Sequence, residues 1–416
     1  MRRVIVVGGG ASGMIAAGRA AECGADTVLL EKMARLGNKL RLTGKGRCNL
    51  TNDTDIDNFV SHFGPNGRFL YGALSRFTPR DLVTFFERRG VPTVTERGGR
   101  VFPASNDAHQ VADVLAQYVR ENGVQIRYKS RVDRLLIEDG RLCGVMARSE
   151  CIRGKAVVIA TGGASYPATG STGDGYRLAG SVGHHIVPIR PALVPLETED
   201  DIAPKLQGLS LRHVRATLLL DGTPLASEFG EMLFTHFGVS GPIILTLSKR
   251  ANESLSRGKA ELSIDLKPAL DDEELDERLR RGLERNGKRR YHNLLRDLLP
   301  GKMVDIFVDL TRIPEDKPGN QITAEERARL HRLLKDFRLK VVGTRPIAEA
   351  IVTAGGVDTR EIDPRTMASR LVEGLFFCGE VIDIDADTGG YNLQAAFSTG
   401  YVAGEAAAHY VSERHE

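Results

Sequence analysis

Three glycines and one acid near the N-terminus have the types and spacing to hold phosphates and a ribose. Gly8, Gly10 and Gly13 fit the pattern G-x-G-x-x-G, and Glu31 follows further along the chain. In this pattern the first glycine permits a tight turn, the second lets a pyrophosphate approach the backbone, and the third lets a helix pack on a strand. An acid about 20 residues further on accepts hydrogen bonds from ribose hydroxyls. The spacing therefore predicts an adenine-dinucleotide site, and the carboxylate favours FAD or NAD over NADP.

The segments around these residues predict a strand, a turn, a helix and a second strand in succession. Val4–Val7 is a continuous apolar run, which is typical of a parallel strand buried on both faces. An Ala-rich helix starts directly after the glycines, and its free N–H groups and positive dipole end would face the phosphates. We therefore expect Ala11 and Ser12 to contact the pyrophosphate, and Lys32, next to Glu31, to be a further cofactor contact.

Later features favour FAD over NAD. Two apolar strands each end in glycine, and an Ala-rich helix follows the second. Because parallel strands end at one edge of a sheet, these ends return to the crevice beside the first turn. Glu380 would accept hydrogen bonds from ribityl hydroxyls, and N–H groups opening the last helix would stabilise negative charge on the flavin N1/O2 edge. Lys39 would neutralise the pyrophosphate, and the backbone of Val132 would meet the adenine edge. The predicted FAD contacts in these segments are Lys39, Val132, Thr161, Gly162, Gly379, Glu380, Asp383, Asn392, Leu393 and Gln394.

A flavin that transfers hydride needs a proton source from the protein, and Cys48 is the leading candidate. Arg41, Lys45 and Arg47 surround it in sequence, and nearby cations lower the pKa of a thiol. The alternative is that Cys48 only packs in the core. His236 is a second candidate catalytic residue, which would hydrogen-bond a substrate carbonyl or the flavin edge, and a structural role for it is equally open.

Length and composition describe an ordinary globular protein of more than one domain. The chain has 416 residues, of which 41% are hydrophobic and 27% charged, and one core rarely grows beyond about 250–300 residues. No apolar run reaches the roughly 18 residues of a membrane span. The first strand begins so early that we expect no signal peptide and a cytoplasmic location. Five scattered cysteines without a CxxC pair argue against a metal site.

The predicted fold class is α/β, with a Rossmann-like FAD-binding domain that is split in sequence. We assign this domain to residues 1–190 and 345–416. Short β-rich runs separated by turns then predict an inserted β-rich, barrel-like domain over 191–268 and 301–344, which includes a returning helix. A charged helical pattern predicts a small helical domain over 269–300.

Several long motifs carry a resemblance to a known family. GGGASG, ATGG, FFCGE and TGGYNLQ resemble motifs of the two-dinucleotide-fold flavoproteins. The segments 37–52 and 233–242 are more narrowly similar to the YhiN/BaiN-type, or aminoacetone oxidase-like, NAD(P)/FAD-dependent oxidoreductases. The resemblance spans nearly the whole chain and implies a split FAD domain with two inserted domains. It also implies a flavin oxidoreductase, in a family that includes reductases of unsaturated steroid intermediates and of a uridine base in large-subunit ribosomal RNA.

The resulting prediction is a FAD-dependent oxidoreductase that passes hydride to an activated double bond of an unidentified acceptor. The glycine-rich stretch 170–175 follows no strand, so NAD(P)H would reduce the flavin as a transient co-substrate and not from a site of its own. One alternative is a ribosomal RNA uridine reductase, that is, a dihydrouridine synthase of 23S rRNA. Another is a non-enzymatic flavin redox sensor.

One basic run suits contact with an RNA acceptor. Lys288, Arg289 and Arg290 are followed by Tyr291 and His292, and cations beside an aromatic ring fit both phosphate binding and base stacking. The alternative is a solvated basic face without a partner. We therefore expect a small-molecule or RNA acceptor and leave the oligomeric state open.

Overall fold

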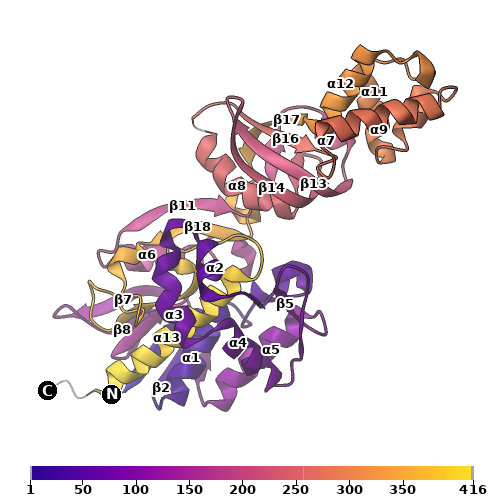
Figure 1. The fold of residues 1–416 in the computed structure, drawn as a ribbon. Coiled ribbons are helices and arrows are strands. Elements are labelled where there is room, and N and C mark those ends of the chain that lie inside the picture. The colour runs from indigo at the N-terminus through magenta and orange to yellow at the C-terminus, as the bar shows by residue number, and fades with distance from the viewer. Residues whose placement is uncertain (1, 256, 414–416) are drawn as a thin grey trace. The chain divides into compact units, whose positions relative to one another are not determined.

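The chain divides into two compact units. The structure is a computed structural model that describes residues 2–255 and 257–413 (Figure 1). The first unit is Met1–Ala192 with Ile347–Glu416, and the second is Leu193–Pro346. Each unit has its own cluster of buried apolar side chains.

A five-stranded parallel sheet forms the centre of the first unit. Its order is β19-β10-β1-β2-β6, and every neighbouring pair runs parallel. The apolar run predicted as a strand lies in β1 and is completely or almost completely buried, as expected of a parallel strand covered on both faces. The α/β, Rossmann-like fold class is thereby confirmed. The five strands are β1 (Arg3–Val7), β2 (Asp26–Leu30), β6 (Gln125–Arg127), β10 (Ala156–Ile159) and β19 (Leu375–Phe377).

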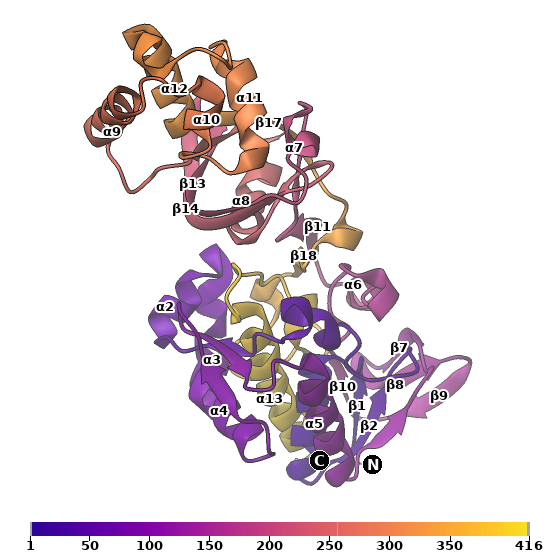
Figure 2. The ribbon, with the colours of Figure 1, turned by 90° about the vertical axis from the view of Figure 1, so that its right-hand side faces the viewer.

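Two helices from opposite ends of the sequence pack against each other on this sheet. They are α1 (Ala11–Glu22) and α13 (Tyr391–Ser412), and Figure 2 shows α13 alongside the strands. A Cβ atom at Gly400 would lie 2.4 Å from the backbone oxygen of Ser12. The helices therefore approach so closely that this position of α13 accepts only glycine, and the last helix is held beside the first turn.

Smaller sheets and helices complete the first unit. Three further sheets are ordered β3-β5-β4, β7-β8-β9 and β11-β18. The helices and strands are α2 (Ile56–Ser61), α3 (Tyr71–Arg76), α4 (Pro79–Glu87), α5 (Ala108–Glu121), α6 (Asp174–Gly180), β3 (Thr51–Asn52), β4 (Thr93–Thr95), β5 (Arg100–Pro103), β7 (Val132–Glu138), β8 (Arg141–Ala147), β9 (Glu150–Arg153), β11 (Ile186–Ala192) and β18 (Val352–Val357). The 3-10 helices are η1 (Leu40–Gly46), η2 (Gly64–Leu70), η3 (Pro167–Thr169), η5 (Ile347–Glu349), η6 (Thr359–Glu361) and η7 (Gly379–Val381).

The second unit is a closed barrel with a helical insert. The barrel order is β12-β15-β14-β13-β16-β17. Its strands are β12 (Leu196–Thr198), β13 (Ser210–Leu220), β14 (Thr223–Phe234), β15 (Gly238–Ser240), β16 (Ala260–Asp265) and β17 (Phe337–Thr344). The helices are α7 (Ile202–Lys205), α8 (Pro242–Ser254), α9 (Asp272–Arg285), α10 (Tyr291–Leu295), α11 (Gly301–Thr311), α12 (Ala324–Lys335) and the 3-10 helix η4 (Gly319–Gln321).

The helical insert is longer than the segment 269–300 that we predict for it. Helices α9 to α12 run without an intervening strand from Asp272 to Lys335, and Figure 2 shows them together. Phe307 of α11 stacks on Phe337 of β17 with ring centroids 5.8 Å apart. Residues of α11 and α12 belong to the same buried cluster as the barrel. Their apolar spacing is therefore what a helix of the barrel domain would also show, and it did not reveal that the helical insert continues beyond residue 300.

In the part of the chain that the structure describes, no helix is both long and apolar enough to cross a membrane.

Candidate functional site

Each of the three glycines of the first turn is required, or permitted, for a different structural reason. Gly8 has a φ of +106°, and a Cβ atom there would lie 2.5 Å from the oxygen of Ala160. A Cβ atom at Gly13 would lie 1.9 Å from the oxygen of Gly8, so the first and third glycines allow helix α1 to pack on the sheet. A Cβ atom at Gly10 would meet nothing within 4 Å. The middle glycine therefore leaves the N-terminus of α1 open, as an approaching pyrophosphate requires.

Glu31 is fixed beside this turn by backbone N–H groups. Its Oε2 accepts a hydrogen bond of 2.7 Å from Gly9, and its Oε1 accepts one of 2.7 Å from Met33. The side chain is buried, yet each carboxylate oxygen has a second lone pair for a ribose hydroxyl. The role of Gly9, which orients the acid, is not visible in the G-x-G-x-x-G pattern.

Lys32 has protein partners, and its predicted cofactor contact stays a prediction. Its Nζ lies 2.7 Å from Oδ2 of Asp174 and 2.5 Å from the hydroxyl of Thr172. Arg131 binds the other oxygen of Asp174 at 2.6 Å. Burial favours a higher pKa for Asp174, but the two ion pairs hold it below its usual range. Lys32 and Arg131 therefore anchor the glycine-rich loop before α6.

Lys39 and Glu380 lie together as a part-buried ion pair. The Nζ of Lys39 is 2.8 Å from Oε2 of Glu380 and 2.6 Å from the hydroxyl of Ser165. The N–H of Thr353 donates to Oε1 of Glu380 at 2.8 Å. Burial favours a higher pKa for Glu380, but the charge of Lys39 prevails and lowers it. The carboxylate predicted for the ribityl chain is thus ionised and paired with Lys39. A contact of Lys39 with the pyrophosphate stays a prediction.

The ends of β10 and β19 have the backbone turns and an open polar atom that suit a ligand. Gly162 and Gly379 have φ values of +69° and +75°, a region that strongly favours glycine. The hydroxyl of Thr161 is buried without a hydrogen-bond partner. A buried polar atom without a partner usually indicates a missing ligand or water, so Thr161 fits a site that a cofactor completes.

The N-terminus of α13 lies against Asn49 and the start of β3. Gly390, the N-cap, has a φ of +100°, and a Cβ atom there would lie 2.4 Å from the oxygen of Thr51 and 2.9 Å from Oδ1 of Asn49. The Oδ1 of Asn49 is also buried without a partner. The first N–H groups of a helix lack intrahelical acceptors, and they therefore suit the flavin carbonyl edge. Together with Thr161, these open polar groups fit a bound flavin.

The polar side chains at the start of α13 form hydrogen bonds within the protein. The side-chain amide of Asn392 donates to the oxygen of Ala386 and accepts from its N–H, each at 2.9 Å. The N–H of Gln394 donates to Gly390 at 3.1 Å, so the prediction that it faces the flavin is wrong. The backbone N–H groups of Asn392 and Leu393 lie within the first turn, where such a contact remains predicted.

Two further predicted contacts also have protein partners. The carboxylate of Asp383 accepts a hydrogen bond of 2.9 Å from Asn66. The backbone oxygen of Val132 accepts one of 3.2 Å from Arg177. The side chain of Val132 is buried. An adenine contact by its backbone and a cofactor contact by Asp383 stay predictions.

The predicted activation of Cys48 by nearby cations is wrong. The thiol is completely buried, and burial raises its pKa to about 12, against a smaller opposite effect of the hydrogen bond with Thr43. Arg41 pairs with Asp113 at 2.6 Å, and Arg47 also pairs with a carboxylate. Arg41 and Arg47 are thus paired with carboxylates, and burial, not a nearby cation, determines the pKa of the thiol. Cys48 has a backbone φ of +59° and packs in the core.

Of the candidates in the second unit, only Tyr291 differs from expectation. His236 is exposed in the turn between β14 and β15, and its ring lies edge-on to Phe237 with centroids 4.9 Å apart. Its catalytic role stays a prediction. Lys288, Arg289 and Arg290 are exposed. Tyr291 is completely buried, so the predicted stacking of this ring on a base is wrong.

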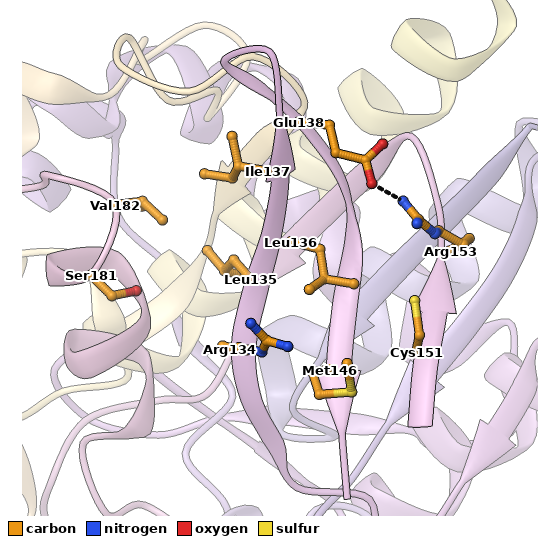
Figure 3. A pocket seen from close by; sticks show the side chains of 10 residues that line it. All are labelled: Arg134, Leu135, Leu136, Ile137, Glu138, Met146, Cys151, Arg153, Ser181 and Val182. Atoms are coloured by element: carbon orange, nitrogen blue, oxygen red, sulfur yellow. Dashed lines mark hydrogen bonds and ion pairs between the residues drawn. The ribbon is translucent and has the colours of Figure 1, made fainter. Parts of the chain in front are cut away.

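A separate cavity of about 570 Å³ lies over the β7-β8-β9 sheet. Figure 3 shows Leu136, Met146 and Cys151 along it, with the ion pair of Glu138 and Arg153 at one end. None of the predicted cofactor residues lines it. Within residues 2–255 and 257–413, no group of three or more His, Cys, Asp or Glu is arranged to hold a metal ion.

The Rossmann-like fold and the comparisons place the chain in a family of FAD-dependent oxidoreductases. The family model described as the HI0933-like protein Rossmann domain matches residues 2–406, and the chain belongs to this family. This is the family that the sequence motifs resemble, so that prediction is confirmed.

Two curated relatives span nearly the whole chain. The 3-dehydro-bile acid delta(4,6)-reductase of Clostridium scindens is 33% identical, over 98% of this chain and 99% of its own. The ribosomal RNA dihydrouridine synthase of Escherichia coli is 31% identical, over 96% of each chain.

A solved structure shares the fold. The 3-ketosteroid delta1-dehydrogenase of Sterolibacterium denitrificans has a TM-score of 0.54 and 14% identity, and the similarity covers 98% of this chain and 100% of that one. At this level of identity, the similarity extends to the fold alone.

Proposed function

We propose that the protein is a FAD-dependent reductase that takes hydride from NAD(P)H and adds it, together with a proton from water, to a carbon–carbon double bond conjugated to a carbonyl group. The observation that carries this proposal is the full-length similarity to the two relatives. The name of one describes reduction of a bile acid that carries a keto group, and the product named for the other is uridine with its ring double bond reduced. Both names describe hydrogen added to the same type of bond.

The residues of the site have distinct tasks in this reaction. Bound FAD supplies the hydride chemistry. The N-terminus of α1 binds the pyrophosphate, and Glu31 accepts from the ribose hydroxyls. The ion pair of Lys39 and Glu380 presents an oriented carboxylate to the ribityl hydroxyls. The N-terminus of α13 stabilises negative charge that develops on the flavin edge.

NAD(P)H docks transiently in this proposal. The stretch 170–175 is the loop anchored by the ion pair of Asp174 with Lys32, and not a second phosphate turn after a strand. A donor that dissociates after the flavin is reduced would leave the site free for the acceptor.

A second candidate function is reduction of a uracil ring in RNA. Residues 278–296 contain eight cations and one carboxylate, Glu284, and all eight cations are exposed. Such a surface fits an RNA phosphate backbone. The cations are Arg278, Arg280, Arg281, Arg285, Lys288, Arg289, Arg290 and Arg296.

Anaerobic flavin spectroscopy tests the shared chemistry. The protein loaded with FAD is reduced with NADPH or NADH and then mixed with 2-cyclohexen-1-one or with the saturated control cyclohexanone. We expect the flavin absorbance to bleach on reduction and to return with the unsaturated ketone but not with cyclohexanone. If the acceptor is RNA, we expect the absorbance to return when ribosomal RNA is added instead. A flavin that neither nicotinamide bleaches would contradict the proposal.

A comparison of nucleosides separates the two acceptors. Ribosomal RNA from a strain that lacks the gene is digested and compared with the parent by mass spectrometry. Loss of dihydrouridine identifies an RNA acceptor, and an unchanged profile leaves the small-molecule acceptor.

A further inference from the structure

The side-chain oxygen of Asn49 lacks a hydrogen-bond partner inside the protein. Its Oδ1 is buried, with no donor among the residues that the structure describes. A buried acceptor without a donor costs the desolvation of that group. Such atoms in native proteins usually bind a ligand or water, so Asn49 is prepared for a donor from outside the chain.

The position of this oxygen is fixed next to the N-terminus of α13. A Cβ atom at Gly390, the N-cap of α13, would lie 2.9 Å from Asn49 Oδ1. The neighbouring Asn52 donates from its side-chain amide to the oxygen of Gly389 at 3.1 Å. Two segments far apart in sequence are therefore held together here, and the carbonyl oxygen of Asn49 lies beside Gly390, the N-cap of α13.

The pyrimidine edge of a flavin needs both donors and one acceptor. Its O2 and O4 atoms accept hydrogen bonds, and the N3–H between them donates. The N–H groups of a helix can serve the two oxygens, but they cannot serve N3–H. A side-chain carbonyl oxygen next to those N–H groups supplies the missing acceptor.

We propose that Asn49 Oδ1 accepts a hydrogen bond from the N3–H of the bound flavin. The inference rests on the proposed function in one respect, namely that FAD binds with its pyrimidine edge at the N-terminus of α13. No other unpartnered oxygen of the described residues matches it equally well. Thr51, Thr161 and Thr198 have hydroxyls, which donate as well as accept, and Thr198 belongs to the second unit. The amide of Gln394 donates to the oxygen of Phe77, and the side chain is completely buried.

Binding of FAD and of FAD methylated at N3 tests this hydrogen bond directly. The methyl group removes the donor and leaves the rest of the cofactor unchanged. For the wild-type apoprotein, titrated by flavin fluorescence, we expect FAD to bind at least about tenfold more tightly than 3-methyl-FAD. In Asn49→Ala we expect FAD to bind about tenfold more weakly and the discrimination between the two cofactors to disappear.

Two further variants complete the comparison. Asn49→Asp keeps an acceptor at this place, so we expect it to retain the preference for FAD over 3-methyl-FAD. Asn58→Ala removes an exposed asparagine of α2 that bonds Thr54, and we expect both affinities to equal those of the wild type.

Thermal unfolding shows whether Asn49→Ala acts through the cofactor. Because Oδ1 has no partner within the protein, the apo form of the variant is expected to have a Tm equal to or above that of the wild type. The increase in Tm on adding FAD is expected to be smaller. A variant that melts lower in the apo form points to a structural role and contradicts the proposal.

The outcomes also separate this inference from the proposed function. If the wild type binds FAD and 3-methyl-FAD equally, or if Asn49→Ala retains the preference, the N3–H contact is overturned while the reductase proposal stands. If the wild type binds neither flavin, both proposals fail.

Discussion

At the scale of single residues, burial and pairing decide which groups are chemically active. Cys48 has three cations close to it in sequence, but they lie in ion pairs or away from the thiol, whose pKa is raised to about 12 by burial. Cys151 is an exposed free thiol. The number of cations near a cysteine in the sequence therefore does not indicate how reactive its thiol is.

Alkylation of the folded protein checks the state of Cys48. At neutral pH we expect iodoacetamide to modify Cys151 first and to leave Cys48 and Cys378 unmodified until the protein unfolds, because both are completely buried. Peptide mass spectrometry identifies the modified sites. We also expect Cys48→Ala to keep NAD(P)H-dependent flavin reduction and product formation. Rapid labelling of Cys48 in the folded state would restore it as a proton donor.

The ion pair of Lys39 and Glu380 gives a stability that depends on pH. The folded-state pKa of Glu380 is lowered, so its contribution is present above the unfolded value of about 4.3 and is lost as the pH falls through the folded pKa. Lys39→Met leaves the carboxylate without its cation, and we expect a loss of about 2–3 kcal/mol at pH 7. Urea unfolding at pH 7 and pH 4 should show a smaller difference between variant and wild type at the lower pH. An equal difference at both values would exclude this linkage.

At the scale of elements, close helix packing holds the two cofactor-facing helix ends together. The approach of α13 to α1 leaves no room for a side chain at Gly400, where a Cβ atom would lie 2.4 Å from Ser12 O. The N-termini of both helices face the predicted cofactor, and their spacing depends on this contact.

A pair of glycine-to-alanine variants separates packing from helix propensity. Gly282 of α9 has nothing within 4 Å of a Cβ atom, so Gly282→Ala should stabilise the protein by up to about 1 kcal/mol. Gly400→Ala gains the same propensity but forces the helices apart, and we expect a net loss of about 1–3 kcal/mol with weaker FAD binding. Thermal unfolding with and without FAD measures both. If Gly400→Ala is as stable as Gly282→Ala, the helices tolerate more separation than the structure indicates.

If the basic surface of α9, α10 and the loop between them binds RNA, the RNA affinity should fall as the salt concentration rises. Arg285, Lys288 and Arg290 are exposed cations on it. For a single-stranded fragment of ribosomal RNA, we expect their joint replacement by Glu to lower the salt dependence, the slope of log K against log salt, by about 2. Replacing Lys259 and Lys340, on barrel strands or near them, by Glu serves as a control. Unchanged RNA affinity in the triple variant would remove this surface from the RNA proposal.

At the scale of the whole molecule, the second unit has the properties of an independent domain. It has its own buried cluster, and the chain enters and leaves it side by side, since the N–H of Arg345 donates to the oxygen of Pro195 at 3.0 Å. We expect a fragment of residues 193–346 to fold cooperatively and to bind no FAD. Circular dichroism and flavin titration check both points, and a fragment without a cooperative transition would contradict this division.

The sequence by itself determined the parts of this protein that depend on local order along the chain. Buried strands, the glycine turn, the first helix and Glu31 follow one another within the first 31 residues, so their geometry is set by short connections and by backbone requirements of glycine. The Rossmann-like fold class and the family followed from such segments.

Only the tertiary structure decided which side chains meet. Lys39 and Glu380 are 341 positions apart, and Asn49 meets the start of α13 only because the chain returns to the first unit. The burial of Cys48 and Tyr291 likewise depends on elements that pack from elsewhere in the chain. Hydrogen bonds and desolvation act over a few ångströms in space, and the order of residues along the chain does not reveal those distances.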